Sequence, residues 1–329
     1  MKVLQIVGVD LSKDSIDLFH HDSKNHVKIK NSASGFKELV YWLSNLKLDK
    51  TCVFLVMEHT GFYSFQLEKF LHQQHIQFTK VSALAIKRSL GLIRGKNDKI
   101  DAERIARFGF EKKDKLMAEK PAHPVLQRLQ MLHSTRARLT RYRQSLECAL
   151  KEYRMVLSSS DPIIKIQLTL VKEVAKKIKV LDDQIKQCIA KADQSVNQNF
   201  KLLTSIKGIG DVIATATMVK TKNFTAFKNA RKFSCFCGSA PFDHSSGKSI
   251  RKKTRVSHLA DKTMKTLLTM GARTAIQHDK ELKAFYERRL AMGKSKNSTI
   301  NIVRNKLIFR MFAVINRQTP FIQQYEKAI

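Results

Sequence analysis

Two short apolar runs near the start of the chain each lead into a carboxylate, and this feature most narrows what the chain can fold into. Residues 3–9 precede Asp10, and residues 52–57 precede Glu58. Apolar runs of this length that are rich in β-branched residues are typical of buried strands. We therefore predict two buried strands in one sheet, with Asp10 and Glu58 at one edge of it.

A second pair of acids, Asp98 and Asp101, is spaced three residues apart, which places both on one face of a helix. Four carboxylates gathered at one edge cannot all stay ionised without a counterion, because like charges repel at such distances. Oxygen ligands suit Mg²⁺ or Mn²⁺, so the sequence predicts that these four acids bind one of these cations. Asp14 falls in an expected turn and Asp17 within the next expected strand, so neither is expected as a ligand.

The chain also carries a large excess of positive charge. Lys and Arg together number 61 and Asp and Glu 28, which gives a formal net charge of +33. Such a charge predicts a polyanionic partner, and nucleic acid is the natural one. A basic protein that assembles a site of four acids is therefore expected to cut or join phosphodiesters.

Neither membrane insertion nor secretion is expected. A bilayer span needs roughly 18 consecutive apolar residues, and the sequence has no such stretch. The first apolar run is short and reaches Asp10, unlike a signal peptide. The five cysteines are scattered, and Cys235 and Cys237 have no matching pair for zinc. We expect reduced thiols, no structural metal and a cytoplasmic protein.

The order of expected elements predicts the first domain, residues 1–120. The pattern favours strands at 2–9, 15–20, 25–30, 52–57 and 77–81, with helical sequence at 34–46, 63–74, 83–91 and 98–111. Strands and helices in this order indicate a three-layer α/β domain of the RNase H-like type. Arg94 and Lys96 flank the late acids and are candidate phosphate contacts.

The second predicted domain, residues 121–198, is a helical hairpin. Apolar residues recur at helical spacing over 125–157 and again over 164–189. The break at 158–162 supplies a cap and a proline for the start of the second helix. Two long amphipathic helices joined by a short turn predict an antiparallel coiled coil, which could serve as a spacer arm or as a contact between protomers.

The third predicted domain, residues 199–329, is mostly helical. Residues 203–214 resemble a helix–hairpin–helix, in which Gly208 and Gly210 allow a tight turn that can grip a phosphate, although a purely structural turn remains the alternative. Residues 238–248 are expected to form a loop, and helices are expected at 259–278, 281–291 and 299–316. The predicted nucleic-acid contacts in this domain are Lys207, Gly208, Gly210, Lys248, Arg251, Lys252, Lys253 and Arg255.

Two adjacent serines, Ser245 and Ser246, stand beside this basic cluster. A hydroxyl nucleophile has to lose its proton and needs positive charge around the phosphate that it attacks. The five basic residues that follow would supply the charge, but the same residues would suit a loop that only binds phosphate. From these residues alone, both roles and both serines stay open.

Three segments resemble the motifs of a known family. The residues around Asp10, around Glu58 and from Arg94 to Ala102 resemble the DEDD motifs of the IS110 family of insertion-sequence transposases, whose catalytic domain is similar to RuvC Holliday-junction resolvase. The C-terminal part resembles the same family through residues 206–210 and through a G-x-x-P-x-x-x-x-S-G pattern. In that pattern the family's serine falls on Ser246.

The resemblance implies both the chemistry and the partners. It implies that Asp10, Glu58, Asp98 and Asp101 bind Mg²⁺ and that DNA recombines through a covalent phosphoserine at Ser246. It also implies an oligomer, a dimer or tetramer, whose protomers can share an active site, and a structured guide RNA that pairs with target and donor DNA. The alternatives are a RuvC-like nuclease that uses water and a non-catalytic nucleic-acid-binding protein.

Overall fold

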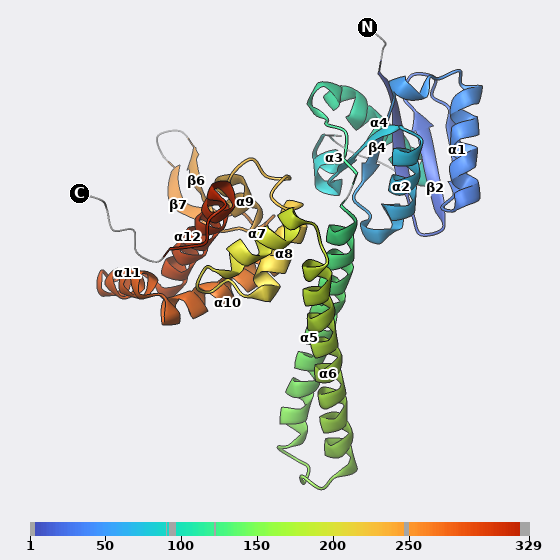
Figure 1. Cartoon of the computed structure of the whole chain (residues 1–329). Coiled ribbons are helices and arrows are strands. Elements are labelled where there is room, and N and C mark those ends of the chain that lie inside the picture. Colours follow the sequence, from blue (N-terminus) through green and yellow to red (C-terminus); the bar gives the residue numbers. More distant parts are fainter. Residues whose placement is uncertain (1–3, 90, 92–96, 122, 247–249, 323–329) are drawn as a thin grey trace. The chain divides into compact units, whose positions relative to one another are not determined.

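The computed structural model describes residues 4–89, 91, 97–121, 123–246 and 250–322, with residues 243–246 and 250–253 described by their backbone alone. The chain divides into two compact units, residues 1–121 and 122–329 (Figure 1). Each unit is described by itself below. The predicted boundaries of three domains stay predictions.

The first unit is built on a mixed five-stranded sheet in the order β3-β2-β1-β4-β5. Strands β1 to β3 are antiparallel neighbours, whereas β4 runs parallel to both β1 and β5. The strands are β1 Gln5–Leu11, β2 Ser15–His20, β3 His26–Lys30, β4 Val53–Glu58 and β5 Gln77–Val81. The predicted mixed α/β architecture is confirmed, and its RNase H-like type stays a prediction.

Helices cover both faces of this sheet, because the side chains of each strand alternate between two cores. Val7 and Val9 of β1 pack with α1 and α2, whereas Ile6 of the same strand packs with α3 and α4. The helices are α1 Ala33–Asn45, α2 Phe65–Gln73, α3 Ala83–Ser89 and α4 Asp98–Lys112. Single 3₁₀ turns occur at Lys50–Cys52, Gly61–Ser64 and Lys113–Lys115.

Helix α4 lies directly on strand β1 at Gly8. A β-carbon at this position would lie 2.1 Å from the carbonyl oxygen of Ala102 and 2.3 Å from the amide nitrogen of Ala106. Both atoms belong to the backbone of α4, so only glycine allows this approach. The contact brings the first turn of α4 towards the part of β1 that carries Asp10.

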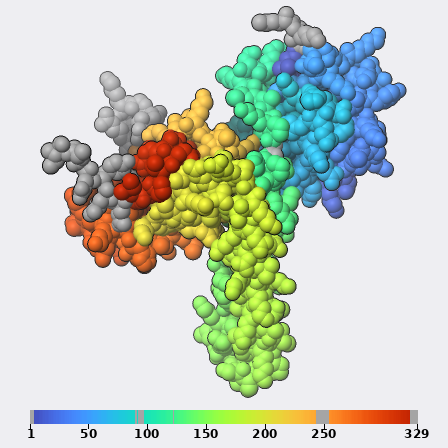
Figure 2. Space-filling view, viewed as in Figure 1, coloured from blue at the N-terminus to red at the C-terminus, as the bar shows by residue number. Residues whose placement is uncertain are grey.

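The second unit begins with a long helical hairpin made of α5 Pro124–Tyr153 and α6 Pro162–Ala190. Asp161 caps α6 through the amide of Ile163, as the predicted break requires. Leu129 and Leu132 pack against Ile185 and Ile189. Figures 1 and 2 show the loop end of the hairpin extending beyond the other helices of this unit. Its assignment as a coiled coil stays a prediction.

The rest of this unit is mostly helical, as predicted. Buried residues of α8, α10 and α12, including Ala214, Leu268 and Leu307, share one core. The helices are α7 Gln194–Thr204, α8 Asp211–Thr221, α9 Ala230–Phe236, α10 Lys262–His278, α11 Lys280–Ala291 and α12 Lys296–Arg317. None of the helices in the described part of the chain is both long and apolar enough to cross a membrane.

One expectation for this unit is wrong. Residues 238–248 were expected to form a loop, but Pro241–Ser246 form strand β6, which pairs antiparallel with β7, Ile250–Val256. Composition is misleading here because Pro241 occupies the first position of its strand, where proline is tolerated. The β-branched residues of β7 then favour an extended partner.

Candidate active site

Asp10 and Glu58 lie side by side at one rim of the sheet. Strand β1 pairs in parallel with β4 so that Val9 is opposite Met57, and the two acids follow directly. Val9 and Met57 are buried in the core beneath α1 and α2, so the alternation of side chains directs both acids to the face covered by α4. Asp10 was expected to follow the first strand, but β1 continues to Leu11 and includes it.

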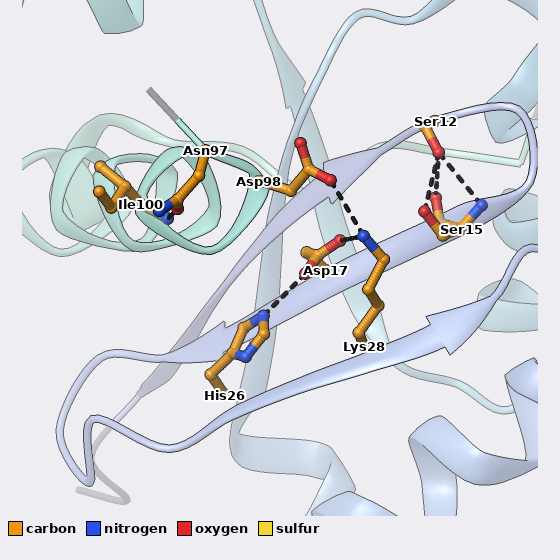
Figure 3. Close-up of polar contacts among 8 residues, drawn as sticks. All are labelled: Ser12, Ser15, Asp17, His26, Lys28, Asn97, Asp98 and Ile100. Atoms are coloured by element: carbon orange, nitrogen blue, oxygen red, sulfur yellow. Dashed lines mark hydrogen bonds and ion pairs between the residues drawn. The ribbon is translucent and has the colours of Figure 1, made fainter. Parts of the chain in front are cut away.

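The first turn of α4 brings the other two predicted acids. Asn97 caps the helix by accepting a hydrogen bond of 2.8 Å from the amide of Ile100 (Figure 3). Asp98 and Asp101 follow in that turn, where the partial positive charge of the helix N-terminus favours carboxylates. Asp98 bonds to Lys28 at 3.0 Å, and Asp101 bonds to Arg104 at 2.9 Å.

The electrostatics of Asp10 indicate that these acids converge. The pKa of the Asp10 carboxyl is raised to about 6, first by burial and then by the charges of Asp101, Asp98, Asp17 and Glu58, in that order. Each neighbour has to be close enough to repel a negative charge on Asp10. The structure therefore brings the four predicted acids together and adds Asp17 to them.

The donor set suits a hard divalent cation, since it consists of carboxylates whose mutual repulsion such a cation would relieve. Among the residues that the structure describes, no three His, Cys, Asp or Glu side chains are arranged closely enough to hold a metal ion. Asp98 and Asp101 instead turn towards Lys28 and Arg104. The chemistry of the donor set fits a metal, and the metal site stays a prediction.

Asp17 is the acid that the sequence reasoning set aside. It lies directly opposite Asp10 in the pairing of β1 with β2, and only 3% of its surface is exposed. His26 and Lys28 contact its two carboxylate oxygens at 2.8 and 3.3 Å (Figure 3). The signal that could have found it is the register of the two hairpins formed by β1, β2 and β3, which pairs Asp10 with Asp17 and Asp17 with Lys28.

The serine candidates lie on the β6–β7 ribbon of the second unit. Ser246 is the last residue of β6 and pairs with Ile250, and Ser245 pairs with Arg251. Arg255 of β7 is exposed. The structure gives only the backbone of Ser245, Ser246, Arg251, Lys252 and Lys253, and the predicted contacts Arg94, Lys96 and Lys248 lie outside the described residues.

The predicted glycine turn joins α7 to α8. Gly208 has a φ of +91°, and a β-carbon there would lie 2.4 Å from the carbonyl oxygen of Gly271 in α10. Gly208 therefore serves the packing of the turn on α10. Gly210 caps α8 and has open space where a β-carbon would be, and Lys207 is exposed. That Lys207, Gly208 and Gly210 contact nucleic acid stays a prediction.

Comparison with known sequences identifies the family to which the chain belongs. Residues 7–156 match the DEDD transposase domain of the IS110 family, and residues 200–287 match the transposase domain of the IS116/IS110/IS902 family. The chain belongs to the IS110 transposase family. The two matches follow each other in one chain and cover both the acid cluster and the serine ribbon.

Relatives of this IS110-family protein match it over nearly its whole length. The pilin gene-inverting protein of Moraxella bovis is 28% identical, over 96% of this chain and 97% of its own. The transposase for insertion sequence element IS1111A of Coxiella burnetii is 24% identical, over 98% and 92%. Among solved structures, T. thermophilus RuvC in complex with a Holliday junction substrate matches with a TM-score of 0.27 and 9% identity, covering 35% of this chain and 98% of RuvC.

Asp10→Asn is expected to stabilise the metal-free transposase at pH 8. The pKa of Asp10 is about 6 in the folded chain against an ordinary 3.8, so the folded state binds this proton more tightly. The contribution of Asp10 to stability is therefore greatest below about pH 4 and is lost as the pH rises through 6. We expect a gain of about 1–2 kcal/mol at pH 8, allowing for solvent screening, and little difference at pH 4.

Chemical denaturation in EDTA at both pH values measures this difference. Asp14→Asn, in the exposed turn between β1 and β2, is the matched control and should change little. An Asp10→Asn variant that is less stable than the parent at pH 8 would contradict the convergence of acids on Asp10.

Proposed function

We propose that this chain is a DNA transposase that cuts and rejoins DNA through a covalent phosphoserine at Ser246. Asp10, Glu58, Asp98 and Asp101 hold a divalent cation, Mg²⁺ or Mn²⁺, at the scissile phosphate. The observation that supports this most is the pKa of Asp10, which burial and then the surrounding acids raise. Such a cluster is unfavourable without a cation, so a structural purpose alone does not account for it.

The chemistry divides between the two units. When bound, the cation would neutralise charge on the phosphate. The oxygen of Ser246 bonds to phosphorus as the bond from phosphorus to one deoxyribose oxygen breaks, and the leaving oxygen gains a proton while the serine loses one. A strand-end hydroxyl then attacks the phosphoserine and restores the serine, so rejoining needs no external ATP. The acid cluster and the serine can come from different protomers of a dimer or tetramer.

The β6–β7 ribbon suits the serine for this role. Ser246 ends β6, and the facing strand β7 carries Arg251, Lys252, Lys253 and Arg255 in its sequence. Four cations on one short strand would attract the DNA backbone to the nucleophile. Further contacts to nucleic acid are proposed at Lys207, Gly208, Gly210, Arg94, Lys96 and Lys248.

We also propose a structured guide RNA as a partner that pairs with both target and donor DNA. The net charge of +33 exceeds what a short DNA site requires and suits a second polyanion. Sequencing the RNA that co-purifies with the chain tests this directly. A discrete species that comes from the flanks of the chain's own gene is expected, and random cellular fragments would contradict the guided function.

The proposed chemistry is tested by trapping the intermediate. The chain is incubated with labelled DNA that contains its site and with Mg²⁺, denatured and digested, and the DNA-linked peptide is identified by mass spectrometry. We expect phosphate attached to Ser246. DNA cleaved to free ends with no linked peptide would favour the water-using nuclease, and uncut DNA at every Mg²⁺ concentration would favour a binding protein.

Site-specific inversion of DNA is a second candidate function. The pilin gene-inverting protein matches nearly the whole of this chain. The same serine chemistry inverts the intervening DNA when two sites face each other within one molecule. A plasmid with two inverted sites separates the two functions, because inversion preserves all of the plasmid DNA whereas transposition moves a segment to a new target.

A further inference from the structure

Lys28 connects two acids that belong to different layers of the first unit. Its ammonium lies 3.3 Å from one carboxylate oxygen of Asp17 and 3.0 Å from one of Asp98 (Figure 3). Lys28 comes from the edge strand β3, Asp17 from β2, and Asp98 from the first turn of α4. The ammonium of Lys28 therefore links Asp17 and Asp98 at the rim of the sheet where the acids gather.

The two contacts of Lys28 differ in how easily they can break. The side chain of Asp17 is 5% exposed, and His26 contacts its other oxygen at 2.8 Å. The side chains of Lys28 and Asp98 are 51% and 63% exposed. Asp17 is thus fixed on two sides, whereas the contact between Lys28 and Asp98 is open to solvent and screened by it. The outer contact is the one that can exchange partners.

We propose that Lys28 is a positioning residue that serves as an internal cation, holding Asp98 while the site is free of metal and releasing it when a divalent cation binds. This inference rests on the metal site proposed above. An ammonium held against Asp98 repels a divalent cation that approaches the same carboxylate, because both carry positive charge. Lys28 therefore competes with the metal and lowers its affinity.

A purely structural tie between β3 and α4 makes the opposite prediction. If Lys28 only fixed α4 on the sheet, its loss would loosen the first turn of α4 and weaken metal binding. The direction of the change in affinity therefore separates the two roles, and it does so without any measurement of DNA cleavage.

The test is calorimetric titration of MnCl₂ into the metal-free full-length chain. Lys28→Met is expected to tighten Mn²⁺ binding about three- to five-fold, the range expected for loss of one exposed ionic competitor. Lys28→Arg keeps the charge and should stay within two-fold of the parent. Lys30→Met removes an equal charge from an exposed position two residues along β3 and should also stay within about two-fold.

A double-mutant cycle tests whether the effect runs through Asp98. Asp98→Asn should weaken Mn²⁺ binding, and Lys28→Met should no longer tighten it in that background. Unchanged or weaker binding in Lys28→Met alone, or the same gain in Lys30→Met, would overturn the competition. A parent chain that binds no Mn²⁺ would overturn the metal site itself and with it the role of Lys28.

Discussion

Ser246→Ala is expected to abolish both the covalent protein–DNA adduct and strand joining. Removing a nucleophile takes away the bond-forming atom, and losses on the order of 10⁴-fold or more follow for such residues. The acid cluster belongs to the other unit of the chain and stays intact, so the variant should still bind DNA and Mn²⁺. Denaturing gels of labelled DNA measure the adduct, and filter binding measures retention of DNA.

Ser245→Ala is the matched control, one residue earlier on β6. It removes the same hydroxyl from the neighbouring position and leaves the proposed nucleophile in place. Ser245→Ala should keep the adduct within a few-fold of the parent. Loss of the adduct in Ser245→Ala together with its retention in Ser246→Ala would identify Ser245 as the nucleophile. Retention of the adduct in both variants would contradict a phosphoserine at either residue.

The sequence predicted the strands and helices of the first unit well, because the spacing of apolar residues indicates most of them. The strands around residues 15–20 and 77–81 and the helix that starts at Asp98 come from apolar spacing alone, and the structure has them at Ser15–His20, Gln77–Val81 and Asp98–Lys112. Local spacing also places Asp98 and Asp101 in one helical turn. These features depend on neighbours in the chain, which a sequence displays directly.

Asp17 and Lys28 could not be found in that way. Their importance depends on strand pairing, which sets Asp17 opposite both Asp10 and Lys28. An acid inside a strand looks unsuited to a buried position until its hydrogen-bond and ion-pair partners are known. His26 and Lys28 are these partners and lie on the next strand. The importance of such residues depends on the register in which the strands pair, which composition does not reveal.

The β6–β7 ribbon shows the same limit in the second unit. Proline, glycine and serine between residues 238 and 248 favoured a loop, yet Pro241–Ser246 pair with a lysine- and arginine-rich strand. A two-stranded ribbon buries little apolar surface, so it lacks the apolar alternation by which strands are recognised. Its basic content predicts a nucleic-acid partner, which stays a prediction, whereas its strand conformation could not be predicted from composition.

Gly8→Ala is expected to disable the acid cluster without touching any acid. The added β-carbon would lie 2.1 and 2.3 Å from backbone atoms of Ala102 and Ala106, which cannot move unless α4 moves with them. Such overpacking costs about 1–3 kcal/mol or more of unfolding free energy. Because α4 carries Asp98 and Asp101, a displacement of about 1 Å would reduce strand joining by about 100-fold. Thermal unfolding, Mn²⁺ titration and strand joining measure the three effects.

Gly109→Ala is the control, because Gly109 lies on the face of α4 that packs on the sheet. Its β-carbon would meet side-chain methyl groups of Val56 and Ile6 at 2.7 and 2.8 Å, which can shift more easily than a backbone. Gly109 also lies 11 residues beyond Asp98 in α4, about 16 Å along the helix. This variant should lose stability but keep most of its Mn²⁺ affinity. Equal losses of affinity in both variants would mean that the contact at Gly8 does not position the acids, since general loosening of α4 would then explain both.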